Sequence, residues 1–117
     1  YIPCLALPGG ELKHGPLALL SDGYPVVAVV PSDGNIHLME SSIRECKSRG
    51  AHIILITDSE GPITELADTL IQTNRTHPEL STFLNIIPIQ LLAYKVGVLK
   101  GVNVDRPRNL AKSVTVV

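Results

Sequence analysis

Lys112 is the residue in this chain that is best suited to covalent chemistry. Apolar Leu110 and Ala111 precede it and a valine stands two positions after it. Apolar surroundings disfavour the charged form of an amine, and a neutral amine can attack a carbonyl carbon. The alternative interpretation is that Lys112 is a solvated side chain in a frayed chain terminus. The segment 103–117 also contains Pro107, so contacts must order it and helix propensity cannot.

His14 is the second candidate, at the end of the run Glu11–His14. This run places a carboxylate, an ammonium group and an imidazole within four residues of one another. Histidine both gives and takes a proton near neutral pH, so a loop that presents His14 to a ligand could perform acid–base catalysis. The alternative is a surface turn in front of a short helix that begins at Gly15-Pro16, where proline suits the first helical position.

Three stretches carry a family resemblance: Gly10–Leu19, Ile87–Tyr94 and Val104–Val116, the last of which reads VDRPRNLAKSVTV. In order and spacing they resemble the glucosamine-6-phosphate synthase family, the isomerising glutamine:fructose-6-phosphate aminotransferases. The third stretch is long and therefore specific. The similarity runs from about Gly10 to the end of the chain and is weak between Ser32 and Thr82.

The resemblance implies an enzyme that converts fructose 6-phosphate and glutamine-derived ammonia to glucosamine 6-phosphate and glutamate. Lys112 would form an imine with the open-chain ketose, and His14 would assist ring opening in the active site of a neighbouring subunit. No cofactor and no metal ion are expected. The other implied roles are substrate wrapping through backbone contacts (Asn109, Leu110, Ala111), support of the histidine loop (Glu11, Lys13) and ordering of the tail (Arg106, Arg108).

The resemblance also places parts of the enzyme outside this chain, which begins at Tyr1 without an initiator methionine. A carboxylate base, the phosphate loop of a first sugar isomerase (SIS) subdomain and a glutaminase domain would all come earlier. We therefore predict that the chain is part of a longer enzyme and does not turn over substrate alone. Pro3, Leu5 and Val117 depart from the family pattern, which has polar residues at the first two positions and usually glutamate at the last.

Two apolar runs of strand length, Pro25–Pro31 and His52–Asp58, flank a predicted helix over Ile36–Arg49. Both runs are predicted to be strands that are buried on both faces of a parallel sheet. The helix has apolar residues at helical spacing and ends at Gly50. A short helix, a more exposed strand and a long apolar helix follow. Their predicted positions are near Pro62, over Thr69–Thr73 and over Leu80–Leu99. Ser32, Asp33 or Asn35 is predicted to cap the helix over Ile36–Arg49.

This order of elements predicts a three-layer α/β fold of the flavodoxin-like kind with a parallel sheet. The resemblance narrows it to the later part of a second SIS subdomain, residues 1–101, followed by an active-site tail, residues 102–117.

Neither GxGxxG nor GxxxxGK follows a strand, which argues against a nucleotide site. Asp58 is expected to be a turn residue or helix cap and not a metal ligand. Polar residues are predicted at the carboxyl ends of the strands, where ligands collect in such sheets: Ser32, Asp33, Asp58 and Ser59.

The composition limits the partners. A net charge of -1 with 18% charged residues predicts neither nucleic-acid nor anionic-membrane binding. Two distant cysteines without metal-site spacing predict reduced thiols, a cytoplasmic location and no zinc. The helix Leu80–Leu99 is apolar around its circumference but is interrupted by Asn85, Pro88, Gln90 and Lys95. It is therefore predicted to lie in a core or a homodimer interface and not in a membrane.

Two other function classes remain open on the sequence. A regulatory SIS module would bind a sugar phosphate without catalysis and would keep its affinity when Lys112 is replaced. A response-regulator-like or flavodoxin-like interaction domain would need an acidic phosphoacceptor pocket or a flavin loop. Asp33 and Asp58 alone form neither of these.

Overall fold

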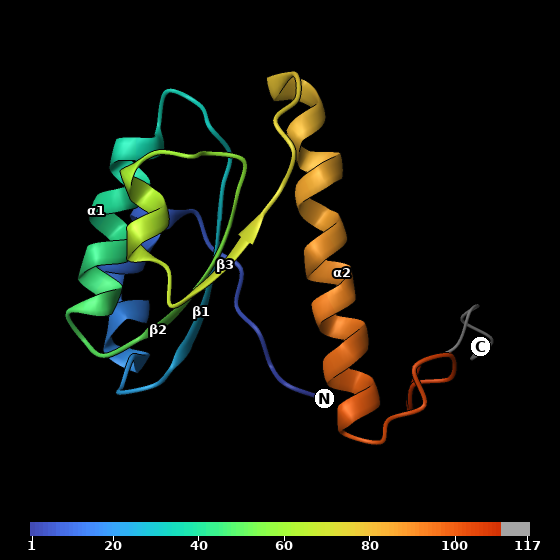
Figure 1. Ribbon diagram of the computed structural model, residues 1–117. Coiled ribbons are helices and arrows are strands. Elements are labelled where there is room, and N and C mark those ends of the chain that lie inside the picture. Colours follow the sequence, from blue (N-terminus) through green and yellow to red (C-terminus); the bar gives the residue numbers. More distant parts are fainter. Residues whose placement is uncertain (111–117) are drawn as a thin grey trace, which may run out of the picture.

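The computed structural model describes residues 1–110 and has three layers (Figure 1). A parallel sheet lies between helix α1 and helix α2, and the 3-10 helices η1 and η3 pack against α1. The predicted α/β fold with a parallel sheet is confirmed. In chain order the elements are η1 (Gly9–His14), η2 (Pro16–Leu19), β1 (Pro25–Val30), α1 (Ile36–Lys47), β2 (His52–Thr57), η3 (Pro62–Leu66), β3 (Thr69–Gln72), η4 (Pro78–Leu80) and α2 (Ser81–Leu99).

The sheet has the order β1-β2-β3, with both neighbouring pairs parallel. Val30 at the end of β1 is in register with Thr57 at the end of β2, and Thr57 in turn with Gln72 at the end of β3. Parallel neighbours require a crossover connection, and the segments that contain α1 and η3 provide the two crossovers. The carboxyl ends of all three strands therefore meet at one edge of the sheet.

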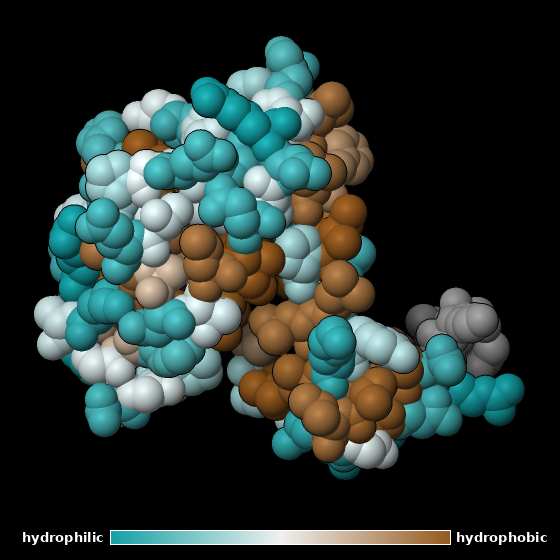
Figure 2. Space-filling view, viewed as in Figure 1, coloured by the Kyte–Doolittle hydropathy of each residue, from teal (hydrophilic) through white to brown (hydrophobic). Residues whose placement is uncertain are grey.

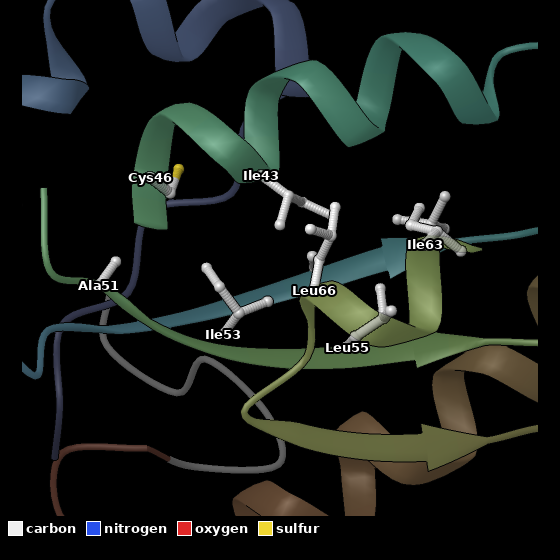
Figure 3. Close-up of a cluster of buried hydrophobic side chains, with 9 residues drawn as sticks. Ile43, Cys46, Ala51, Ile53, Leu55, Ile63 and Leu66 are labelled. Carbon is white, nitrogen blue, oxygen red and sulfur yellow. The ribbon is translucent and has the colours of Figure 1, made fainter. Parts of the chain in front are cut away.

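The apolar core lies between the sheet and α1 (Figure 3). Ile53 and Leu55 of β2 are fully buried there and cluster with Ile43 and Cys46 of α1. Burial raises the pKa of the Cys46 thiol, because the charged thiolate is poorly solvated there. Successive side chains of a strand point to opposite faces, so Ile56, also fully buried, lies on the α2 side.

Helix α1 begins at Ile36, as the sequence predicts, and ends at Lys47, two residues before the predicted Arg49. Asn35 is its N-cap residue, although no side-chain hydrogen bond caps the helix. At the other end Gly50 has φ +80°, and the N–H groups of Gly50 and Ala51 donate to the carbonyls of Lys47 and Cys46 at 2.9 and 3.2 Å. These two bonds form a Schellman motif, in which glycine adopts the left-handed conformation without a Cβ penalty.

The prediction that both apolar runs are buried on both faces is wrong for β1 in this chain. Ala28 and Val30 are buried, but Val27 on the opposite face is 41% exposed. The physical reason is position, because β1 is an edge strand of the sheet and β2 is the central strand. A β-branched run predicts a strand, whereas the burial of that strand depends on what lies beside it.

Helix α2 lies on the other face of the sheet and leaves most of its apolar side chains exposed. Its buried residues are Ser81 and Asn85, and the Asn85 side-chain oxygen accepts a hydrogen bond from the Thr73 hydroxyl at 3.0 Å. Figure 2 shows apolar side chains gathered along this helix. Within residues 1–110, α2 therefore does not lie in a core, which was the first of its two predicted locations. The exposed large apolar residues of α2 are Phe83, Ile86, Ile87, Leu91, Tyr94, Val98 and Leu99.

By length and composition alone, the segment Pro78–Leu99 could cross a membrane. A single helix of this kind is weak evidence for a membrane span, and only 6% of an 18-residue apolar stretch within it is buried. The helix continues through Pro88, and its polar Asn85 is held against the end of the sheet. These contacts fix one side of α2 on the α/β fold and leave the other side uncovered.

An ion pair joins the end of α1 to the start of β3. Lys47 Nζ lies 2.8 Å from Asp68 Oδ1, and the Ile53 N–H donates to Asp68 Oδ2 at 2.7 Å. The backbone hydrogen bond from Ile53 and then the Lys47 ammonium lower the pKa of Asp68, because both favour the carboxylate. Asp68 thereby connects the central strand, the edge strand and α1.

Candidate functional site

The segment that contains His14, η1, packs against helix α1. At Gly9 an added Cβ would lie 2.5 Å from the Met39 sulfur, so η1 approaches the helix closely. Lys13 Nζ lies 2.9 Å from Glu45 Oε1 of α1, and the supporting role expected of Lys13 stays a prediction. His14, the last residue of η1, is exposed, and Gly15 after it has φ +145°. The loop therefore has a fixed base and presents its imidazole to solvent.

The tail begins where α2 ends in a second Schellman motif. Gly101 has φ +66°, its N–H donates to the Val98 carbonyl at 2.9 Å, and the Val102 N–H donates to the Gly97 carbonyl at 2.9 Å. Val104 then folds back over the helix, because an added Cβ at Gly97 would lie only 2.9 Å from Val104 Cγ1. The absence of a side chain at Gly97 makes room for this contact.

Asn103 and Tyr1 hold the next part of the tail. The Asn103 side-chain oxygen accepts hydrogen bonds from the N–H groups of Asp105 and Arg106 at 3.1 and 3.0 Å. The Arg108 N–H donates to the Tyr1 hydroxyl oxygen at 2.6 Å, and the Arg108 guanidinium carbon lies 4.1 Å from the centroid of the Tyr1 ring. The second contact is a cation–π interaction. Arg106 and Arg108 thus contact neighbouring groups through their backbone N–H groups, and their expected role in ordering the tail stays a prediction.

Asn109 and Leu110 follow, and both are exposed. Asn109 has φ +60°, the one left-handed non-glycine residue in the described part of the chain. Asparagine tolerates this conformation better than most residues, because its short side chain can bond locally. Ala111 and Lys112 lie outside the described residues, so the roles expected of them stay predictions.

The histidine loop and the described part of the tail lie on opposite sides of the sheet. The loop packs on α1, whereas the tail follows α2 on the other face (Figure 1). Within residues 1–110, His14 therefore does not approach Asn109 or Leu110. Glu11 is exposed on the same short helix as His14.

The carboxyl ends of β1 and β2 form a separate polar edge. Asp58 is only 8% exposed and accepts hydrogen bonds from the Ser32 N–H at 2.6 Å and the Ser32 hydroxyl at 2.9 Å. A cavity of about 550 Å³ beside this pair is also lined by Glu60 and Arg75. Two carboxylates against one guanidinium disfavour a phosphate dianion there. Among residues 1–110, no group of His, Cys, Asp or Glu side chains could hold a metal ion.

Two residues near these segments, Arg75 and Tyr1, were not predicted from the sequence. Arg75 follows β3, so the rule that placed Ser32 and Asp58 at the carboxyl edge would have found it if applied to the third strand. Tyr1 had no such signal, because its contact with Arg108 joins residues 107 positions apart.

Comparison with known proteins gives the family. The model of the SIS domain matches residues 1–100. The chain belongs to the SIS domain family. A solved structure, the C-terminal domain of glucosamine-fructose-6-phosphate aminotransferase from Francisella tularensis, superposes on this SIS domain with a TM-score of 0.79 at 36% identity. The match covers 86% of this chain and 29% of that one, and it supports the fold described above.

Curated relatives of this SIS domain carry one name, glutamine–fructose-6-phosphate aminotransferase (isomerizing). The protein of Thermococcus kodakarensis is 50% identical over 116 residues, and that of Pyrococcus horikoshii is 48% identical over 116 residues. Each match covers 99% of this chain and 19% of the relative. The chain thus spans about a fifth of the length of these relatives, and the expected resemblance is confirmed.

Proposed function

We propose that this SIS domain is the part of an isomerising glutamine–fructose-6-phosphate aminotransferase that supplies the imine-forming lysine and the ring-opening histidine. The observation that carries the proposal is the similarity of the chain, tail motif included, to relatives of that name at 50% identity over 99% of its length. The substrates would be fructose 6-phosphate and glutamine-derived ammonia, and the products glucosamine 6-phosphate and glutamate.

Lys112 is the proposed nucleophile. Its neutral amine adds to the C2 carbonyl of open-chain fructose 6-phosphate, and loss of one water molecule gives an imine. Asn109, Leu110 and Ala111 would surround the sugar through backbone groups. The left-handed backbone at Asn109 and the exposure of Asn109 and Leu110 leave such groups accessible.

His14 is the proposed catalyst of ring opening. Opening the cyclic ketose moves a proton from the anomeric hydroxyl to the ring oxygen, and an imidazole can take the first and supply the second. Because His14 and the described part of the tail lie on opposite sides of the sheet, a site that uses both segments would be assembled between two chains. Lys13 and its ion pair with Glu45 would hold the loop that crosses to the other subunit.

The remaining parts of the relatives' length would supply the ammonia source, the phosphate loop and the carboxylate base. For this reason we propose that the chain by itself does not turn over substrate. The proposed location is the cytoplasm, because Cys4 and Cys46 are both free thiols, as expected in a reducing compartment.

Borohydride trapping tests the lysine. The full-length protein that carries this chain is incubated with fructose 6-phosphate and reduced, and its peptides are mapped by mass spectrometry. Hydride reduces the imine carbon, so we expect a stable secondary amine on Lys112. Lys112→Arg should abolish the adduct, whereas the control Lys100→Arg, at the other end of the tail, should retain it.

The alternative function gives a different result. If the protein binds fructose 6-phosphate but the label is absent, or falls on another lysine, the tail would only enclose the ligand. A regulatory SIS module would then be the better account. In that case Lys112→Arg should also leave the affinity for the sugar unchanged.

The apolar side of α2 is the proposed homodimer contact. Seven large apolar residues of this helix are exposed, and together they form an apolar surface along its length (Figure 2). Surfaces of this kind mark protein interfaces. Replacing Leu91 with lysine should convert the full-length dimer to a monomer in sedimentation experiments. The matched control Leu38→Lys, an exposed leucine on α1, should leave the dimer intact, and a dimer that survives both changes rejects this interface.

A further inference from the structure

Tyr1 makes two contacts with the tail, of different kinds. Its hydroxyl oxygen accepts a hydrogen bond from the Arg108 N–H at 2.6 Å, and its ring faces the Arg108 guanidinium at 4.1 Å. Both partners are exposed, so neither contact is required for the core. The chain nonetheless brings together two residues that are 107 positions apart.

The hydrogen bond fixes the backbone of the tail and not only a side chain. A backbone N–H has one position and direction for a given chain path, so this bond determines where residue 108 lies. The next residue, Asn109, holds the unusual φ of +60° and begins the proposed substrate-wrapping segment. Earlier in the tail, Val104 is held by α2 and Arg106 by Asn103, so Tyr1 continues a series of anchors towards the proposed site.

We infer that Tyr1 is a positioning residue that holds the tail at Arg108, directly before Asn109 and Leu110 of the proposed substrate-wrapping segment. The inference rests on the proposed function for its effect on the sugar, but not for its effect on the tail. Tyr1 does not touch substrate in this account, and it acts through Arg108.

The same residue connects the two proposed catalytic segments. Residues 1–8 lead directly from Tyr1 into η1, whose last residue is His14. Tyr1 is therefore joined to the tail by its side chain and to the histidine loop by the main chain. Since that loop would serve the neighbouring subunit, Tyr1 is placed to link the tail of one site to the histidine of the other.

The experiment uses two substitutions and a matched tyrosine in the full-length protein. Tyr1→Phe removes the hydrogen-bond acceptor and keeps the ring, whereas Tyr1→Leu removes both contacts. The controls are Tyr24→Phe and Tyr24→Leu, since Tyr24 is also exposed and its hydroxyl has no hydrogen-bond partner among residues 1–110. Two quantities are measured: the rate of tryptic cleavage between Arg108 and Asn109, by peptide mass spectrometry, and the KM and kcat for fructose 6-phosphate.

We expect cleavage to be about five-fold faster in Tyr1→Phe, as for one lost neutral hydrogen bond. It should be about ten- to twenty-fold faster in Tyr1→Leu, which also loses the cation–π contact. KM should rise at least about two-fold while kcat changes less, because the tail must be ordered before it can hold the sugar. The Tyr24 variants should match the wild type in both measurements, and the melting temperature should be the same for all four.

The other possible results distinguish the inference about Tyr1 from the proposed function. Unchanged cleavage in the Tyr1 variants overturns the inference. Faster cleavage with an unchanged KM also overturns it, because Tyr1 would then hold the tail without positioning it for the sugar. A wild-type protein that neither forms the lysine adduct nor consumes fructose 6-phosphate would instead reject the proposed function, and the cleavage rates would still decide whether Tyr1 holds the tail.

Discussion

The contact between Gly97 and Val104 gives the sharpest test of how the tail is held. In Gly97→Ala the new Cβ would lie 2.9 Å from Val104 Cγ1, closer than side-chain carbons approach one another, so the Val104 side chain must shift, and we expect its contact with α2 to be lost. Helix α2 itself should not suffer, because alanine is a better helix former than glycine by about 1 kcal/mol. The perturbation is therefore directed at the start of the tail.

The magnitude follows from the burial of Val104, which is 37% exposed. Full burial of a valine side chain is worth about 1.5–3 kcal/mol, so the two-thirds that is buried here contributes about 1–2 kcal/mol. Loss of that contribution raises the fraction of molecules in which the tail is detached from α2, the open fraction, by about 5- to 30-fold. Val104→Ala removes two largely buried methyl groups, about 1 kcal/mol, and should raise the open fraction about five-fold.

The assay is the rate of tryptic cleavage between Arg108 and Asn109 in the full-length protein, at protease levels where cleavage follows the open population. The decisive variant combines Gly97→Ala with Val104→Ala, so that the methyl group added at position 97 meets no Cγ1 at position 104. This double mutant should be cleaved at about the same rate as Val104→Ala alone, about five times the wild-type rate. A control substitution, Gly34→Ala, places a Cβ where no atom lies within 4 Å and should leave the cleavage rate unchanged.

Additivity would refute this reasoning. If the double mutant were cleaved at the product of the two single-mutant rates, at least about 25-fold faster than the wild type, Gly97 would act on the tail by a route other than Val104. Slower cleavage in Gly97→Ala would also contradict the account, since it would mean that the added methyl strengthens the contact.

Three further outcomes are expected. Leu55→Ala should lower the free energy of unfolding by about 2–5 kcal/mol in urea titrations, because it leaves a cavity at a fully buried site. Iodoacetamide should label exposed Cys4 in the native protein and Cys46 only after unfolding, as peptide masses will show, since Cys46 is buried and its pKa is raised. Asp68→Asn should lower the melting temperature at pH 7, and its difference from the wild type should shrink as the pH is lowered below about 4. The Ile53 N–H and a lysine ammonium lower the pKa of Asp68, so their stabilisation is complete above about pH 4 and is lost as the pH falls through the lowered pKa.

The elements of the α1 side could be predicted because their signals are local. The β-branched composition of β2, the helical spacing of α1 and the left-handed glycine at its end each follow from residues within a few positions. The polar edge followed from topology, because parallel strands bring their carboxyl ends together. The same reasoning did not predict that the Asp58 carboxylate would accept hydrogen bonds from Ser32 in the loop after β1, because this contact depends on where Ser32 lies.

The family, the parallel α/β fold and the two segments proposed to carry chemistry could be identified from sequence patterns, because motifs and periodicities depend on residues that are close in the chain. Tertiary packing was needed to show that, within residues 1–110, β1 is half exposed, the apolar side of α2 is uncovered, and His14 and the tail lie on opposite sides of the sheet. It also decided that Tyr1 meets Arg108. These features depend on which distant surfaces pack together, and no local pattern of residues encodes a contact across 107 positions.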